Sequence, residues 1–317
     1  HLFIKISKTI IDFHKLKFYI QKINILMKIY DCITYFNEKT LFELRLNILD
    51  KFIHRFVVVE ANYTHSGNPK KLNFNINDYP KFKDKIIYIP LLKSPKNIKL
   101  PLKNFKRFNS IQRIAYQRNA ILKSIKNAKN NDIIIYSDSD EIPNLSNLDF
   151  NNIKEKFIIF KQKLFYYKLN LELKLVPWYG SRACKKKNLV DINHLRNLKP
   201  KKYPWWRLDT FIKPNKERSI KIIENGGWHF SQIMSPKQIQ LKLLNDEHHD
   251  EYELNKLKYT KIKDMIKKKY VIYDHNADQK DLKKKWNNKI FLTKINTNKL
   301  PDYIKKNLKK YRNLISN

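Results

Sequence analysis

Three carboxylates lie within four residues, directly after an apolar run that is typical of a buried strand. The β-branched and aromatic run at 133–136 follows a polar turn, and Asp138, Asp140 and Glu141 come after it. Ligands of open α/β sheets bind beyond the carboxyl ends of the strands. Carboxylate oxygens suit hard divalent cations such as Mg²⁺ or Mn²⁺. The pattern favours an Asp-x-Asp that holds a metal ion and the diphosphate of a nucleotide sugar. The alternative is a solvated acidic turn.

A second group of candidate residues stands in the segment Asn-Gly-Gly-Trp-His-Phe-Ser at 225–231. Half of the chain's four glycines, Gly226 and Gly227, are adjacent here, which indicates positive φ angles or a close backbone approach. The imidazole of His229 is a suitable ligand for a divalent ion, and Trp228 offers a flat wall for a sugar ring. The alternative is a tight turn followed by a packed Trp and a surface His.

Further polar residues are expected near the acidic segment. Asn37, Glu38 and Glu60 end the first two predicted strands and could hold a base or ribose, or they could be ordinary loop residues. Arg118, in a predicted helix just before the acidic strand, could pair with a diphosphate, with the Asp cluster, or in a structural ion pair. The loop aromatics could stack on acceptor sugars or pack in the core; they are Trp178, Tyr179, Trp205, Trp206 and Trp228.

The elements that must position these residues alternate between strand and helix in the first half. Strands are predicted at 28–33, 55–61, 85–91 and 133–136, with helices from 40 and over 111–128. This order predicts an α/β fold with a mostly parallel, Rossmann-like sheet flanked by helices. Closely spaced strands at 157–160, 164–167, 171–176 and 219–223, followed by helices, predict a mixed second half and a helical C-terminus.

Composition narrows the function classes. Four glycines cannot form a Walker loop or a GxGxxG motif, so a nucleotide must be held another way. Two cysteines exclude a disulfide framework and a Cys-based zinc site, and a reducing compartment, the cytoplasm, is expected. The net charge of +37 is spread along the chain, so no nucleic acid is expected, although peripheral contact with a membrane surface would suit it. No apolar run is long enough for a transmembrane helix.

An ordered set of segments resembles glycosyltransferase family 17, the family of β-1,4-mannosyl-glycoprotein 4-β-N-acetylglucosaminyltransferase. The segments are MKIYDCITYFNE (27–38), LFELRLNIL (41–49), FVVVEANYTHSGNPK (56–70), QRNAI (117–121), SDSDEIP (137–143) and NGGWHFS (225–231). The resemblance implies a GT-A fold, a UDP-GlcNAc donor and an inverting reaction. It also implies a divalent metal at Asp138 and Asp140, and our candidate to complete its shell is His229.

These inferences together predict a metal-dependent inverting glycosyltransferase that moves a sugar, GlcNAc, from UDP-GlcNAc to a glycan acceptor with Mn²⁺ or Mg²⁺. An inverting transfer needs a carboxylate base, for which Glu224, Asp209 and Glu141 are candidates. The catalytic domain is predicted at 27–296, with a basic C-terminal helix or tail at 297–317. Residues 1–26 are either an amphipathic extension or lie outside the true coding start. The rival hypotheses are an inactive sugar-binding module and a basic nucleic-acid-binding protein.

Overall fold

The computed structural model describes most of the chain from Met27 onward. The described residues are 27–99, 105–201, 203–204, 206–212, 216–255, 257–277, 282–287 and 289–316. The predicted N-terminal extension at 1–26 and the loop residue Trp205 lie outside them.

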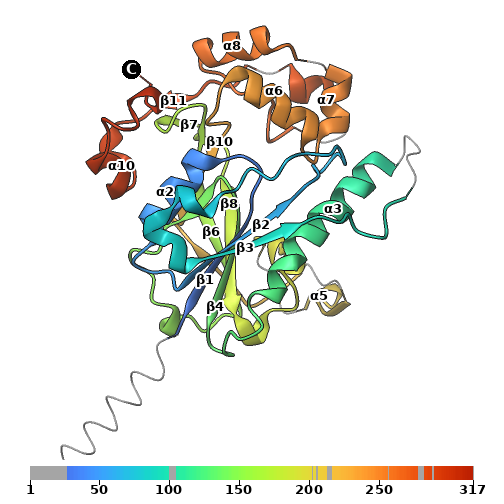
Figure 1. Cartoon of the computed structure of the whole chain (residues 1–317), viewed down its shortest axis with the longest axis vertical. Coiled ribbons are helices and arrows are strands. Elements are labelled where there is room, and N and C mark those ends of the chain that lie inside the picture. Colours follow the sequence, from blue (N-terminus) through green and yellow to red (C-terminus); the bar gives the residue numbers. More distant parts are fainter. Residues whose placement is uncertain are drawn as a thin grey trace, which may run out of the picture.

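The first half forms a parallel sheet, as the sequence predicts. Strands β1 (Ile29–Thr34), β2 (Arg55–Ala61), β3 (Ile86–Leu91) and β4 (Ile133–Asp138) are ordered β4-β1-β2-β3, with every neighbouring pair parallel. Helix α2 (Lys39–Leu49) packs with Ile33, Val58 and Ile135 on one face. Helix α3 (Lys106–Ala120) and the turn after it pack on the other face, with the alternate strand residues (Figure 1).

The second half extends the same sheet with antiparallel and parallel strands. β8 (Trp178–Lys185) is antiparallel to β4, and β6 (Phe157–Tyr166) is antiparallel to β8. β9 (Ile220–Ile223) and β10 (Gly227–Ser231) both run parallel to β6. The short strands β5 (Glu141–Pro143), β7 (Leu171–Glu172) and β11 (Thr293–Lys294) complete an 11-stranded mixed sheet among the described residues. The α/β class and the mixed second half are confirmed, but the sheet as a whole is mixed, and its parallel part is β4-β1-β2-β3.

A helical layer covers the end of the sheet where β10 finishes. It contains α6 (Pro236–Asn245), α7 (His249–Asn255) and α8 (Tyr259–Lys268), which group together in Figure 1. Ile239 and Leu243 of α6 and Ile262 and Met265 of α8 share a core with Leu164 of β6. α6 begins with a Ser235 capping box and Pro236 in its first turn. The C-terminal end of α6 lies beside the acidic segment, where Lys242 contacts Asp140.

The remaining helices are short. They are α4 (Ile192–Asn197), α5 (Asp209–Ile212), α9 (Leu282–Trp286) and α10 (Asp302–Lys306). α10 lies against α2 and buries Ile304 in the core that α2 shares, so the predicted C-terminal tail includes a docked helix. No described helix combines the length and apolar character needed to cross a membrane.

A buried ion pair fixes α2 beneath the acidic segment. Arg45 of α2 binds Asp31 of β1 through two hydrogen bonds of 2.6 and 2.7 Å, and both side chains are fully buried. The same guanidinium donates a third hydrogen bond to the backbone carbonyl of Glu141. Because the guanidinium is planar and bidentate, it links β1, α2 and β5 with a fixed geometry. Arg45 therefore holds the backbone of the loop that carries Asp138 and Asp140 in a fixed position relative to β1 and α2.

Candidate active site

A cavity of about 240 Å³ lies beyond the carboxyl ends of β1, β2 and β4. Its walls come from both halves of the chain: the strand ends and α3 on one side, β10 and the end of α6 on the other. Among the predicted site residues, it brings together Glu38, Arg118, Asp138, Asp140 and His229. The cavity stands where ligands of α/β sheets are expected to bind.

Asp138 lies at the end of β4 and is held by two arginines. Arg196 of α4 approaches Oδ2 to 2.5 Å, and Arg118 of α3 lies 3.6 Å from Oδ1. The Tyr136 hydroxyl donates a hydrogen bond to Oδ1 at 3.3 Å. Burial disfavours the charged carboxylate, but Arg196 and then Arg118 outweigh it and hold the pKa of Asp138 well below its usual range. Asp138 is therefore ionised at neutral pH and fixed in place.

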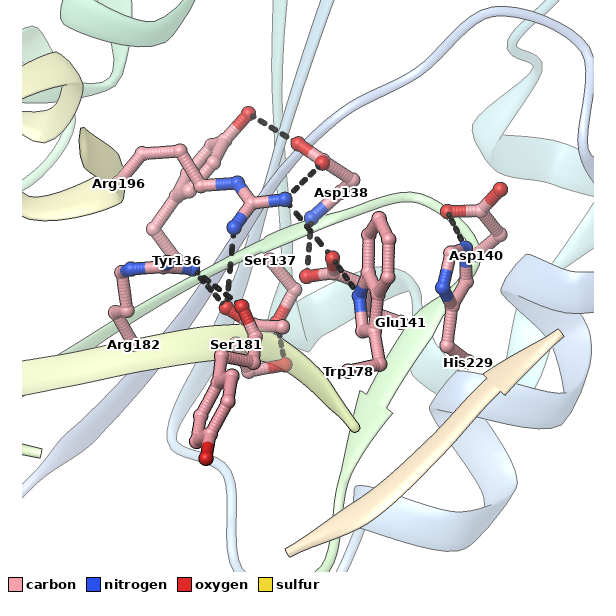
Figure 2. Close-up of polar contacts among 12 residues, drawn as sticks. Tyr136, Ser137, Asp138, Asp140, Glu141, Trp178, Ser181, Arg182, Arg196 and His229 are labelled. Atoms are coloured by element: carbon pink, nitrogen blue, oxygen red, sulfur yellow. Dashed lines mark hydrogen bonds and ion pairs between the residues drawn. The ribbon is translucent and has the colours of Figure 1, made fainter. Parts of the chain in front are cut away.

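Glu141 is fully buried behind Asp138 and does not line the cavity. Its carboxylate accepts hydrogen bonds from Arg196 (2.9 Å), from the Trp178 indole (2.8 Å) and from the Asp138 backbone N–H (3.2 Å). Figure 2 shows the Arg196 guanidinium reaching both Asp138 and Glu141. With both oxygens engaged, Glu141 orders the loop and has no access to an acceptor.

Asp140 points to different partners, as Figure 2 shows for His229. Its Oδ1 lies 3.4 Å from His229 Nε2, and its Oδ2 lies 3.2 Å from Lys242 Nζ of α6. The Lys242 amine also lies 3.5 Å from Glu38 Oε1. Burial opposes ionisation, yet Lys242 and His229 keep the pKa of Asp140 far below its usual range. Lys242, in turn, has a raised pKa because Asp140 and Glu38 overcome the effect of its own burial.

Asp140 and His229 meet because β5 and β10 pair. His229 stands opposite Glu141 in the antiparallel register, and the Phe230 N–H donates to the Asp140 carbonyl at 2.8 Å. Gly227 makes this approach possible: at φ +128°, a Cβ there would lie 2.1 Å from the Ile142 carbonyl oxygen. The predicted close backbone approach of the glycine pair is therefore present. Trp178 packs against the His229 ring at 4.4 Å between centroids and limits its rotation.

Asp140 and His229 are the two residues best placed to hold a divalent cation. A single ion bonded to each at about 2.0–2.2 Å can span their 3.4 Å separation. Asp138, the third predicted ligand, is instead engaged by Arg196. Over the described ranges no group of three or more His, Cys, Asp or Glu side chains forms a metal cluster. A magnesium-type ion needs no such cluster, because it commonly takes its other ligands from water and substrate phosphates. The imidazole of the pair favours a divalent transition ion such as Mn²⁺ over Mg²⁺.

Other predicted nucleotide-sugar contacts lie outside this cavity. Glu60 is fully buried and accepts hydrogen bonds from Lys70 (2.5 Å), Tyr88 and two backbone amides, so it orders the loop after β2. Asn37 borders a neighbouring cavity that adjoins the first at Phe36, Glu38 and Lys242. Trp228 packs against the core on the strand face opposite His229.

The other two predicted base candidates also stand away from the cavity. Glu224 is 67% exposed and pairs with Lys161 at 2.9 Å. Asp209 begins α5 and pairs with Arg207 at 2.8 Å and with Lys216. Neither lines the cavity. The predicted aromatic Trp178 does line it, whereas Tyr179 and Trp206 do not.

The structure adds residues that the sequence analysis did not single out. The most important are Arg196, Lys242 and Asp246, joined by His65, Tyr273 and His275 along the cavity wall. Apart from His65, which stands in the segment 56–70, no motif marks them, and one more cation in a chain with 66 Lys and Arg carries no signal. Asp246 lies just before the acid and histidine run at 248–251. His248 of that run also lines the cavity.

Ionised carboxylates and cations line a cavity at the strand ends of an α/β sheet, which is where proteins of this fold class commonly bind their ligands. Residues 7–199 match the model of glycosyltransferase family 17, and the chain belongs to this family. It is therefore a glycosyltransferase, and the family resemblance stated from the motifs is confirmed. No curated protein matches the chain.

Several solved structures are similar to the chain at low identity. HddC from Yersinia pseudotuberculosis shares 12% identity at a TM-score of 0.33, over 63% of this chain and 92% of that one. Glucosyl-3-phosphoglycerate synthase from Mycobacterium tuberculosis, in complex with Mn²⁺, UDP and phosphoglyceric acid, shares 13% sequence identity at a TM-score of 0.32. The match covers 68% of this chain and 74% of that one. A glycosyltransferase involved in the glycosylation of the major capsid of PBCV-1 shares 10% sequence identity at a TM-score of 0.27. The match covers 62% of this chain and 82% of that one.

Proposed function

We propose that the chain is an inverting, metal-dependent glycosyltransferase of GT-A type that transfers GlcNAc from UDP-GlcNAc to a glycan acceptor. The observation that carries the proposal is the convergence of Asp140, His229 and Lys242 beside Arg118, at the ends of parallel strands. The family supplies the reaction class. The cavity supplies ionised carboxylates for a cation and two cationic side chains for a diphosphate.

The first-half wall of the cavity suits the nucleoside. It is formed by the ends of β1 and β2, including Tyr35, Phe36 and Tyr63. Glu38 shapes this wall, because its carboxylate accepts hydrogen bonds from the Phe36 and Asn37 backbone amides at 3.1 and 3.0 Å. Aromatic side chains next to backbone polar groups can hold a flat base by stacking and fix its orientation.

The diphosphate belongs between Arg118 and Lys242, next to Asp140. A divalent cation held by Asp140 and His229 would neutralise charge on the departing diphosphate. Lys242 and Arg118 add fixed positive charge in a site where burial strengthens electrostatic attraction. Arg196 keeps Asp138 from turning away, and Trp178 keeps the imidazole of His229 facing Asp140.

The test is a thermal-shift panel of UDP-, GDP- and CMP-sugars, each with and without Mn²⁺. We expect UDP-GlcNAc with Mn²⁺ to stabilise the protein by about 2.7 kcal/mol at a hundredfold excess over Kd. Asp140→Asn should lose both this stabilisation and transfer. The matched control is Asp264→Asn on α8, whose carboxylate pairs with Lys268 at 3.0 Å. Equal stabilisation of Asp140→Asn and wild type would refute the assigned metal and diphosphate site.

A further inference from the structure

The carboxylates of the cavity differ in whether a cation neutralises them. Five carboxylates line it: Glu38, Asp138, Asp140, Asp246 and Glu247. Glu38 and Asp140 pair with Lys242, Asp138 pairs with Arg196, and Glu247 lies 3.3 Å from Arg107. Within the described part of the chain, Asp246 is the member of this set that has no ion pair within 4.0 Å. Because no cation of the described residues pairs with it, the Asp246 carboxylate can accept a proton.

The position of Asp246 places it beside the donor site. It caps the C-terminal end of α6, four residues after Lys242, so both side chains lie on the same helical face one turn apart. Lys242 contacts Asp140, and Asp246 therefore stands about one helical turn, roughly 5–6 Å between Cβ atoms, from a residue at the diphosphate. Both residues line the cavity, so Asp246 borders the same space as the proposed diphosphate site.

The orientation of the Asp246 carboxylate is also fixed. Its Oδ1 accepts a hydrogen bond of 2.8 Å from the His248 backbone N–H. Oδ2 remains for an acceptor hydroxyl. A base needs such an arrangement, with one oxygen held and the other within reach of the proton that it removes.

We propose that Asp246 is the catalytic base of the transfer. This inference rests on the proposed function. Asp246 Oδ2 removes the proton from the acceptor hydroxyl as that oxygen forms a bond to the anomeric carbon of GlcNAc. The bond between this carbon and the β-phosphate oxygen breaks, and its electron pair leaves with UDP. The proton stays on Asp246 until solvent removes it, and no oxidant or further reactant is required.

The surroundings of Asp246 give it the basicity that this role needs. Burial raises its pKa to about 6, while the nearby His248 and Lys242 act in the opposite direction and Glu247 adds to the rise. Tyr273 also faces it. A carboxylate of this basicity is mostly ionised at neutral pH and accepts a proton more readily than an ordinary one.

The histidines of the cavity are less suitable. Burial lowers the pKa of His65 to about 4 and that of His275 to about 3, so both are weaker bases than Asp246. His275 Nε2 also contacts the Tyr166 hydroxyl. His248 is engaged by Glu251 at 2.9 Å and by Arg107 at 2.8 Å, and His229 faces Asp140.

The experiment compares Asp246→Asn, Asp246→Glu and the control Asp264→Asn in the full chain. UDP release from UDP-GlcNAc with Mn²⁺ is followed with water alone and with p-nitrophenyl β-mannoside, and UDP-GlcNAc affinity is measured by calorimetry. We expect Asp246→Asn to lose about 10²–10⁴-fold in kcat while the donor Kd stays within about threefold of wild type. Asp246→Glu should recover part of the rate, and the acid limb of the wild-type pH profile near 6 should be absent in Asp246→Asn.

Three outcomes would overturn the assignment. Turnover of Asp246→Asn within about threefold of wild type would exclude a base role, since general bases contribute far more. Loss of donor affinity together with turnover would make Asp246 a binding or structural residue. A large loss in Glu247→Gln with none in Asp246→Asn would move the role to the neighbouring carboxylate. Failure of wild type itself to bind UDP-GlcNAc would instead refute the proposed function on which the assignment rests.

Discussion

Asp246 should destabilise the folded protein at neutral pH, and removing its charge should stabilise it. Burial raises the pKa of this carboxyl from an ordinary 3.8 to about 6. The folded state therefore binds the proton more tightly than the unfolded chain does. The cost of ionisation is absent below about pH 4, grows between pH 4 and 6, and is complete above pH 6.

The size of the effect follows from the same two values. Since each pH unit is worth about 1.4 kcal/mol, a rise from 3.8 to about 6 corresponds to about 3 kcal/mol. Asn cannot ionise, and its Oδ1 can still accept the hydrogen bond from the His248 amide. We expect Asp246→Asn to raise the free energy of unfolding by up to about 3 kcal/mol at pH 7.5 and by almost nothing at pH 4.

Urea denaturation without nucleotide at pH 4, 5, 6 and 7.5 measures this directly. The control is Glu247→Gln, which removes a charge at the adjacent position from a carboxylate that is 39% exposed and paired with Arg107. We expect that variant to change stability by less than about 1 kcal/mol at any pH. A decrease in stability of Asp246→Asn at pH 7.5, or an increase of equal size at all four pH values, would refute the reasoning. If Asp246→Asn is both more stable and less active than wild type, then Asp246 serves catalysis at the expense of stability.

Three further outcomes follow from contacts elsewhere in the molecule. Arg45→Met should lower the free energy of unfolding by about 3–5 kcal/mol in urea, because Asp31 would keep a buried, unpaired charge; a loss below about 1 kcal/mol would contradict this. Gly227→Ala should reduce the Tm more than Gly67→Ala, because the new methyl group would meet backbone atoms at the first position and the flexible Arg113 side chain at the second. Lys242→Met should weaken UDP-GlcNAc binding at least about tenfold in calorimetry, since it removes a charge-assisted contact, and unchanged affinity would place the diphosphate elsewhere.

Local patterns were sufficient for the first half of the fold. The predicted strand at 55–61 is β2 as observed, and those at 28–33 and 85–91 differ from β1 and β3 by one residue. Each is a short apolar run between clear breakers, and β1 and β2 are buried on both faces, which leaves little choice of structure. The helix predicted over 111–128 begins earlier, at Lys106, and its α-helical part ends at Ala120.

The second half was harder because its strands carry polar residues on a buried face. The runs predicted at 157–160 and 164–167 form one strand, β6. Gln162 interrupts the apolar pattern, but its side chain is buried and donates a hydrogen bond to Ser181 at 3.1 Å. β8 was not predicted, because Arg182 and Ser181 stand in its centre. Buried polar residues with partners far along the chain give no periodic signal.

The site residues also divide into those with a local sequence signal and those placed by contacts between distant parts of the chain. Asp138, Asp140 and His229 could be proposed because they follow strand ends or a glycine pair, where local signals are strong. Lys242 and Asp246 reach the cavity through the packing of α6 on β6, which no local pattern specifies. No local signal distinguishes Glu224 and Asp209 from other acidic residues as base candidates, and each pairs with a nearby cation away from the cavity.

Strand β10 also sets how late in synthesis the pairing of Asp140 with His229 can form. It pairs with β5 on one side and β6 on the other, so the backbone contact that joins Asp140 to His229 forms after residue 231 has been made. At about 5–20 residues per second, roughly 5–20 s separate the acidic loop from this strand. During that interval the inner edge of β6 lacks both of its parallel neighbours, β9 and β10, and is exposed to unwanted strand pairing. A nascent chain arrested in this window would contain the Asp-x-Asp segment but not the proposed metal and diphosphate site, and its unpaired strand edge would favour aggregation.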